Sequence, residues 1–257
     1  MQPRAALLRF TLPLLLAGGL AHAAPKPTRA QLIAQLDDPD VEVAAQAATA
    51  LGDVAEAHGA LAAALDKAPP ARIAKALVAS LAQRPAAGDA ARIVRYARHR
   101  NAEVRAATVT ALARYASDAA AQDAIRDGLH DDVAAVRAAA TAAVATAKLR
   151  TAIDPLIQLV GRGEPTAATA IAAIADREVV AKLAGQIGKL PDAALVSVFA
   201  AILQARGPDA VRVEVVAALA QIQDASAIEA LTAYVSAAPR SPSRADAEKA
   251  IADRGAR

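Results

Sequence analysis

An arginine-rich segment with one tyrosine is the part of this sequence best suited to bind a charged partner. It reads ARIVRYARHRNAEVR and ends at Arg105, and its arginines recur at helical spacing. Guanidinium groups bind carboxylates and phosphates through paired hydrogen bonds, and tyrosine is frequent in binding surfaces. We therefore expect an acidic protein segment or another polyanion to bind here. The candidate partner-binding residues are Arg92, Arg95, Tyr96, Arg98, Arg105 and Arg114.

The alternative for this segment is a solvated helix face without a partner. Charge runs on helices usually keep the outer surface of a protein in water and do nothing more. The two interpretations differ in salt dependence, because contacts to phosphates weaken steeply as salt rises.

The histidines and acidic residues form no recognisable catalytic or metal-binding motif. His58, His99 and His130 each lie at an expected turn or helix end, without the spacing of a His-Glu-x-x-His site. The acidic runs 37–40 and 131–132 lack the further ligands and glycine of a calcium loop, and helix capping explains them. We therefore expect no catalytic residues, no metal and no cofactor, and we predict that the protein is not an enzyme.

The composition favours closely packed helices. Of the 257 residues, 55% are hydrophobic but only 2% are aromatic, and much of the apolar content is alanine. Alanine is the best helix former and adds little side-chain volume. Such a chain fills a thin helical array more easily than a compact core.

The N-terminus has the layout of a secretory signal peptide. Arg4 and Arg9 precede the apolar run LPLLLAGGLAHA, which ends in a small-x-small cleavage signal. A membrane anchor is the alternative, but the run is too short to span a bilayer. We expect cleavage between Ala23 and Ala24, and with no cysteine in the chain there is no lipid attachment through an N-terminal cysteine. The predicted location is the periplasm or the exterior of the cell, with no transmembrane anchor after cleavage.

Cleavage also removes most of the net positive charge. The full chain has 29 Lys and Arg against 26 Asp and Glu, and loss of Arg4 and Arg9 leaves 27 against 26, a net charge of +1. Nucleic-acid-binding proteins are typically basic. We therefore expect no nucleic acid as partner.

A repeat of 30 to 32 residues runs through most of the chain. Apolar residues recur at this interval, and in most repeats another apolar residue lies eight positions earlier. This period indicates stacked supersecondary units, and the spacing of eight places both residues on one stripe of a helix. The later residue of each pair is Leu51, Leu81, Leu112, Val144 and Ile174.

Each of these helices has a start signal and is preceded by a second apolar segment. Asn101, the Asp131-Asp132 pair and Pro165 are examples of residues that cap a helix or open its first turn. The repeating unit is therefore helix, short turn, helix. In the fourth unit we expect Val136 to be buried between repeats and Thr141 to lie on the exposed side of the same helix.

The segments LDDPDVEVAAQAATALGDV, NAEVRAATVTAL and DDVAAVRAAATAAV resemble HEAT repeats of the short bacterial type found in bilin-lyase-like proteins. The resemblance is good over residues 29–176 and loose over 177–236. It implies an all-α fold, a right-handed α-solenoid (superhelix) of about seven stacked helical-hairpin repeats. It also implies that Asp132, Arg105, Arg137 and Arg212 bond across turns and between repeats.

The regular phase is lost after Ile174. The segments that begin at Pro191 and Pro208 both look like second helices, yet they start 17 residues apart. One of them must act as a first helix, and we expect a bend or an altered groove there. The expected organisation is a signal peptide at 1–23, a HEAT-like solenoid at 24–237, and a linker with a short helix at 238–257.

Helical solenoids present extended surfaces that commonly bind other proteins. From this we predict a non-enzymatic protein-binding or scaffold protein that acts outside the cytoplasm, with another protein as partner. Two alternatives remain open: a polyanion or acidic-segment binder that uses the Arg92–Arg114 region, and a lyase-like or other enzyme on a HEAT scaffold.

Overall fold

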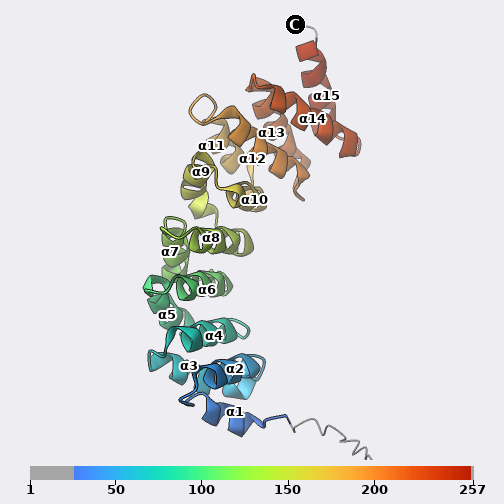
Figure 1. The fold of residues 1–257 in the computed structure, drawn as a ribbon. Coiled ribbons are helices and arrows are strands. Elements are labelled where there is room, and N and C mark those ends of the chain that lie inside the picture. The colour runs from blue at the N-terminus through green and yellow to red at the C-terminus, as the bar shows by residue number, and fades with distance from the viewer. Residues whose placement is uncertain (1–25, 256–257) are drawn as a thin grey trace, which may run out of the picture.

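The computed structural model describes residues 26–255, and throughout this range the regular structure is helical. The predicted signal peptide at 1–23 lies outside the described residues. Consecutive helices alternate between two layers, and the elongated stack bows gently from one end to the other (Figure 1). The prediction of an all-α solenoid is confirmed.

The first layer holds the odd-numbered helices, and in the lower part of Figure 1 it forms the outer, convex side. These helices are α1 (Arg29–Gln35), α3 (His58–Asp66), α5 (Asp89–Val94), α7 (Ala119–Gly128), α9 (Ile153–Gly161), α11 (Arg177–Ala184), α13 (Asp209–Gln221) and α15 (Pro242–Gly255). Short 3-10 turns adjoin three of them: η1 (Ala55–Ala57), η2 (Arg95–Arg98) and η4 (Arg150–Ala152). A fourth, η3 (Ala113–Tyr115), follows α6 of the second layer.

The second layer holds the even-numbered helices, which contact one another in an unbroken series from α2 to α14. These helices are α2 (Val41–Leu51), α4 (Ala71–Leu81), α6 (Ala102–Leu112), α8 (Ala134–Ala147), α10 (Pro165–Ile174), α12 (Asp192–Gln204) and α14 (Ala225–Ala237). Within the described range the stack therefore contains seven hairpins, followed by α15.

The expected helix starts are formed by capping residues. Asp40 accepts the backbone N–H of Glu42 at 2.8 Å, and Asn101 accepts that of Glu103 at 2.8 Å. Pro165 opens α10, where its missing N–H costs no hydrogen bond. The start of α8 differs from the expectation, because its N-cap is Val133 without a side-chain cap and Asp131 instead accepts the Val133 N–H at 2.9 Å.

The apolar stripes found in the sequence form the seams between repeats. Val136, Ala140 and Val144 of α8 are buried, as predicted. Thr141 is buried as well, which corrects the expectation that it lies on the exposed side. The cause is that α8 packs against α6, α7 and α10 together, so its buried arc is wider than one stripe. The Thr141 hydroxyl is satisfied by donating to the Arg137 carbonyl at 2.8 Å.

After Ile174 the regular spacing of the repeat is lost, but the helices continue to alternate between the two layers. Although its sequence looks like a second helix, α13 contacts α11 and α15 and therefore lies in the first layer. The final helix, α15, starts at Pro242 and packs against both α13 and α14, with Ser243 and Ala247 buried. Within residues 26–255 no helix has both the length and the apolar character needed to cross a bilayer.

Candidate functional site

Arg92 of α5 and Arg95 of η2 form ion pairs with the preceding repeat. Arg92 Nε donates to Asp66 Oδ2 at 3.0 Å, and an Arg95 guanidinium nitrogen donates to Asp66 Oδ1 at 2.6 Å. The hydrogen bond from Arg92 holds the pKa of the Asp66 carboxyl below its usual range, and Arg95 adds to this effect. Two of the six predicted binding residues thus share one acid on α3.

Tyr96 is part of the packing between repeats. Its ring is buried, its hydroxyl donates to the Leu65 carbonyl at 2.6 Å, and burial raises its pKa. The ring also stacks on His99, with centroids 6.2 Å apart and planes inclined by 21°. His99 Nδ1 in turn accepts the Asn101 N–H at 3.0 Å. Tyr96 therefore fixes the turn before α6 and leaves little of its ring for a partner.

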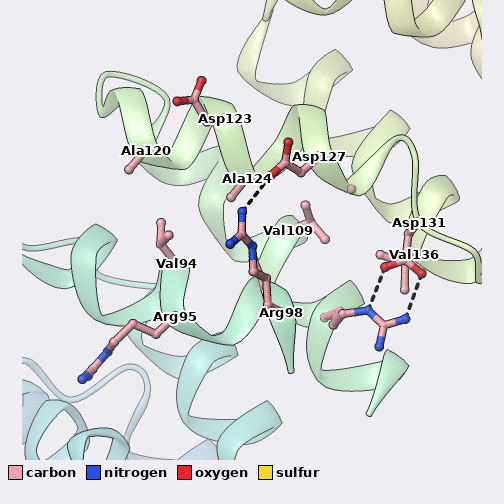
Figure 2. Close-up of a pocket in the computed structure, with 13 residues that line it drawn as sticks. Val94, Arg95, Arg98, Val109, Ala120, Asp123, Ala124, Asp127, Asp131 and Val136 are labelled. Atoms are coloured by element: carbon pink, nitrogen blue, oxygen red, sulfur yellow. Dashed lines mark hydrogen bonds and ion pairs between the residues drawn. The ribbon is translucent and has the colours of Figure 1, made fainter. Parts of the chain in front are cut away.

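Arg98 lies at a groove between neighbouring repeats. The groove has a volume of about 540 Å³ and is formed by residues of α5, η2, α6, α7 and α8 (Figure 2). Arg98 reaches Asp127 of α7 at 3.6 Å, and both side chains are mostly exposed. Asp123 and Asp127 on one wall and Arg95 and Arg98 on the other give the groove mixed charge. This mixed charge suits an acidic partner less well than a wholly basic face would.

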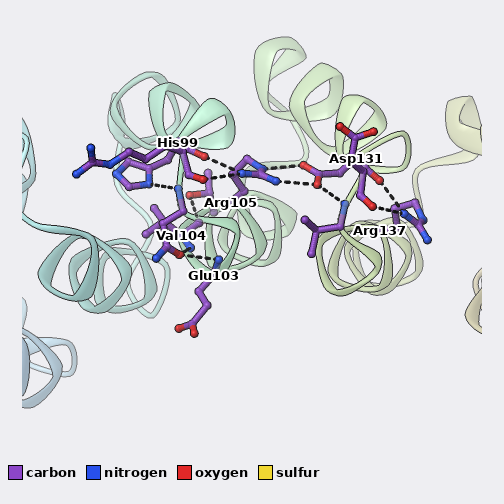
Figure 3. A network of polar contacts seen from close by, with 11 residues as sticks. His99, Glu103, Val104, Arg105, Asp131 and Arg137 are labelled. Atoms are coloured by element: carbon purple, nitrogen blue, oxygen red, sulfur yellow. Dashed lines mark hydrogen bonds and ion pairs between the residues drawn. The ribbon is translucent and has the colours of Figure 1, made fainter.

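Arg105 belongs to a ladder that joins successive second-layer helices (Figure 3). It donates to both oxygens of Asp131, at 2.7 and 2.8 Å, and to the His99 carbonyl at 2.9 Å. Hydrogen bonding to Arg105 lowers the pKa of Asp131, while the same contact raises that of Arg105. Arg105 thus bonds both to the turn that precedes its own helix, through the His99 carbonyl, and to the turn that precedes α8, through Asp131.

Arg137 repeats this arrangement one unit further along. It donates to the Asp131 and Asp132 carbonyls at 2.9 and 3.0 Å, and its Nε donates to Glu164 at 2.8 Å. The acid of the ladder is therefore Asp131, whereas the resemblance implied Asp132. Asp132 takes part only through its backbone carbonyl.

Arg114 is separated from the other candidates. It is exposed and borders a groove of about 510 Å³ on the second layer, beside Gln83, Thr110 and Thr146. A neighbouring groove of about 550 Å³ continues along α2 and α4. The structure thus brings Arg92 and Arg95 together on Asp66, places Arg98 and Arg105 on separate acids, and puts Arg114 on the other layer. Their role in binding a partner stays a prediction.

A buried carboxylate beside a histidine was missed by sequence reasoning. Asp89 at the start of α5 is 1% exposed, and His58 Nε2 from α3 lies 3.1 to 3.2 Å from its oxygens. Tyr115 donates to Asp89 at 3.3 Å and lies 3.2 Å from the Leu81 carbonyl, and burial raises its pKa strongly. The His58 side chain keeps about a quarter of its surface exposed. A partly exposed imidazole held by a buried carboxylate is an arrangement suited to proton transfer.

This pair left one signal in the sequence. His58 and Asp89 are 31 residues apart, which is one repeat length. Residues one repeat apart occupy equivalent places on neighbouring units and can touch.

Comparison with known proteins gives a fold and no family. No protein-family model matches the chain, and no curated protein matches it. Among solved structures it is similar to a chain in the complex of CpcE and CpcF of phycocyanin lyase from Nostoc sp. PCC7120, with 16% identity and a TM-score of 0.50. The match covers 97% of this chain and 99% of that one.

Two engineered proteins are also similar. One has 20% identity and a TM-score of 0.37 over 90% of this chain and all of its own length. The other has 22% identity and a TM-score of 0.35 over 89% of this chain and 96% of its own. The end-to-end likeness to the lyase chain confirms the HEAT-repeat-like fold.

The prediction of a non-enzymatic protein-binding or scaffold protein is wrong, and so is the prediction that the protein is not an enzyme. The likeness to a chain of a phycocyanin lyase favours the alternative of a lyase-like enzyme. The prediction had relied on contiguous motifs. In a solenoid, chemically matched residues come together one repeat apart, as His58 and Asp89 do, and no local motif records them.

Proposed function

We propose that the protein is a lyase-like enzyme built on a helical-repeat scaffold. The supporting observation is the likeness of fold along the whole chain to a subunit in the phycocyanin lyase complex. That protein is a complex of two subunits, so we further propose that this chain works with a second protein, as a pair of solenoids. The substrate would be a protein that carries, or receives, a covalently attached group.

His58 is the residue that we propose for proton transfer. Lyases make or break a bond next to a double bond, and a proton must be added or removed in the process. In the tautomer with its hydrogen on Nε2, the ring donates to the Asp89 carboxylate and Nδ1 can act as a base. A carboxylate that orients an imidazole in this way holds one tautomer in place.

We also propose that the protein acts outside the cytoplasm. The support is the sequence of residues 1–23 alone, with two arginines before an apolar run and a small-x-small cleavage signal. Intact-mass measurement of the protein recovered from its host tests this, and a chain that keeps residues 1–23 contradicts it.

The activity can be tested with phycocyanin as the probe. Apo-phycocyanin and its bilin would be incubated with the chain alone, and with the CpcE or CpcF subunit added as partner. Covalent attachment is read as visible absorbance that stays with the denatured protein. A rate above that without the chain supports the proposal, and no attachment and no removal in any combination overturns it.

The role of His58 is tested in the same assay. His58→Gln should lower the rate by about 100-fold, a typical contribution of general acid–base catalysis. His130→Gln is the matched control, because His130 is an exposed histidine at the end of another first-layer helix. Equal rates for the two variants would remove His58 from the mechanism.

A further inference from the structure

A cavity of about 630 Å³ lies where the regular phase of the repeat is lost. It is bounded by α12, α13, α14 and the turn that follows α14, and most of its wall is apolar. Cavities of this size accommodate small organic molecules. The apolar lining includes Leu203, the Tyr234 ring, Pro239 and several alanines.

Arg212 lines this cavity from α13 in the first layer, whereas the two ladder arginines lie in α6 and α8 of the second layer. Arg105 and Arg137 both follow a valine, bond to carbonyls of the preceding turn, and reach an acid 26 or 27 residues later. Arg212 also follows a valine, and it donates to the Ala205 carbonyl at 2.9 Å. Among the described residues, however, no carboxylate forms an ion pair with it.

The missing acid is explained by the sequence at the equivalent positions. Residues 26 and 27 positions after Arg212 are Ala238 and Pro239, which have no carboxylate and which both line the cavity. The cavity therefore opens where Asp131 or Glu164 would lie in the earlier repeats. A guanidinium group with unused donors faces an apolar space of molecular size.

Most of the other polar groups at the cavity are already engaged, and the exception is Gln204, an exposed residue of α12. Asp209 also lines it, but its oxygens accept the hydroxyl and the backbone N–H of buried Ser243, the latter at 3.2 Å. The Tyr234 hydroxyl lies 2.6 Å from the Ser243 hydroxyl, and that of Ser241 lies 3.1 Å from it. The hydrogen bonds from Ser243, and also the charge of nearby Arg212, lower the pKa of the Asp209 carboxyl, so this acid partly offsets the guanidinium charge. Arg212 is the one cationic side chain among the residues that line the cavity.

We propose that this cavity binds a small organic carboxylate with an apolar body, and that Arg212 pairs with the carboxylate. The ligand would supply the acid that Arg105 and Arg137 find 26 or 27 residues later and Arg212 does not, while its apolar part fills the space between α12 and α14. The site is separate from His58 and does not depend on the proposed lyase activity.

Octanoate and octanamide are suitable probes, because they differ mainly in charge. In calorimetric titrations of the mature protein, octanoate should bind at least tenfold more tightly than octanamide. Arg212→Gln should remove that difference, while Arg206→Gln, which removes the same charge from a neighbouring exposed position outside the cavity wall, should keep it. No binding of octanoate, or equal binding of both probes to the unaltered protein, overturns the proposal.

A second variant covers the case in which Arg212→Gln does not fold. Pro239→Glu places a carboxylate 27 residues after Arg212, the same spacing as from Arg137 to Glu164. The new acid should pair with Arg212 and weaken octanoate binding at least tenfold, with helicity unchanged. Undiminished binding by a folded Pro239→Glu protein would show that Arg212 is not the anchoring group.

Discussion

Arg105 in α6 reaches across the seam between two repeats and holds Asp131 with hydrogen bonds of 2.7 and 2.8 Å. The contact is mostly shielded, with 18% of the arginine side chain and 13% of the aspartate side chain exposed. Both partners also bond to backbone groups, since Arg105 donates to the His99 carbonyl and Asp131 accepts the Val133 N–H. The pair therefore links two turns and two helices at once.

Removing this link should destabilise the protein measurably. Arg105→Gln breaks hydrogen bonds to a shielded charge, so the free energy of unfolding should fall by about 1.5–3 kcal/mol. Arg98→Gln is the control, because the Arg98–Asp127 pair is almost fully exposed and its loss should matter little. Urea denaturation of the two variants provides the comparison, and equal midpoints would mean that the ladder adds no stability.

The same pair should make stability depend on pH. Because Arg105 lowers the pKa of Asp131 in the folded state, the carboxylate stabilises the fold above its unfolded pKa of about 3.9. This contribution is lost as pH falls through the lower folded pKa. The difference in unfolding free energy between the unaltered protein and Arg105→Gln should therefore be larger at pH 7 than at pH 3. Urea titrations at both pH values measure it, and a difference that does not change with pH would contradict the assignment.

A charge placed at the seam of α8 should be costly. Val136 is 1% exposed, so Val136→Asp buries a carboxylate without a partner and should cost several kcal/mol. Ala135→Asp introduces the same side chain one residue earlier, at an exposed position in the first turn, where a negative charge is favourable. Thermal melts should show a large loss for the first variant and almost none for the second. Similar melting temperatures would mean that the two faces of α8 are exchanged.

Two glycines should respond in opposite ways to alanine. At Gly59 an added Cβ meets no atom within 4 Å, so Gly59→Ala should stabilise α3 by up to about 1 kcal/mol through helix propensity. At Gly128 the Cβ would lie 3.0 Å from Val109 Cγ1 and 3.1 Å from Ala140 Cβ, two buried side chains that cannot move aside. Overpacking should cancel or exceed the gain there. Denaturation midpoints that rise equally in both variants would contradict the close approach of α7 to α6 and α8.

The recurrence of apolar residues every 30 to 32 positions predicted the helical layers well, because each repeat packs on the next through the same buried positions. Val136 and Val144 were placed correctly for this reason. The burial of Thr141 was not predicted. Apolar residues at intervals of four mark only one face of a helix, whereas α8 packs against α6, α7 and α10.

Pairings between repeats were harder to predict than the layers. Asp131 and Asp132 are adjacent and chemically equivalent, and only the path of the turn decides which one faces Arg105. The contact of His58 with Asp89 joins two units and has no local motif. The sequence of one repeat therefore predicts the helices of that repeat, whereas the side-chain contacts between neighbouring repeats are visible only in the structure.

The two ends of the stack are closed to different degrees. Helix α15 packs on both layers of the last hairpin and buries Ser243 and Ala247, whereas α1 has no fully buried residue. In a linear array each unit is stabilised chiefly by its neighbours, so a closed end and an open end make unfolding directional. On heating, the repeats next to α1 should therefore unfold first and those next to α15 last. The cavity beside Arg212 lies near α15, in the part of the stack that should unfold last.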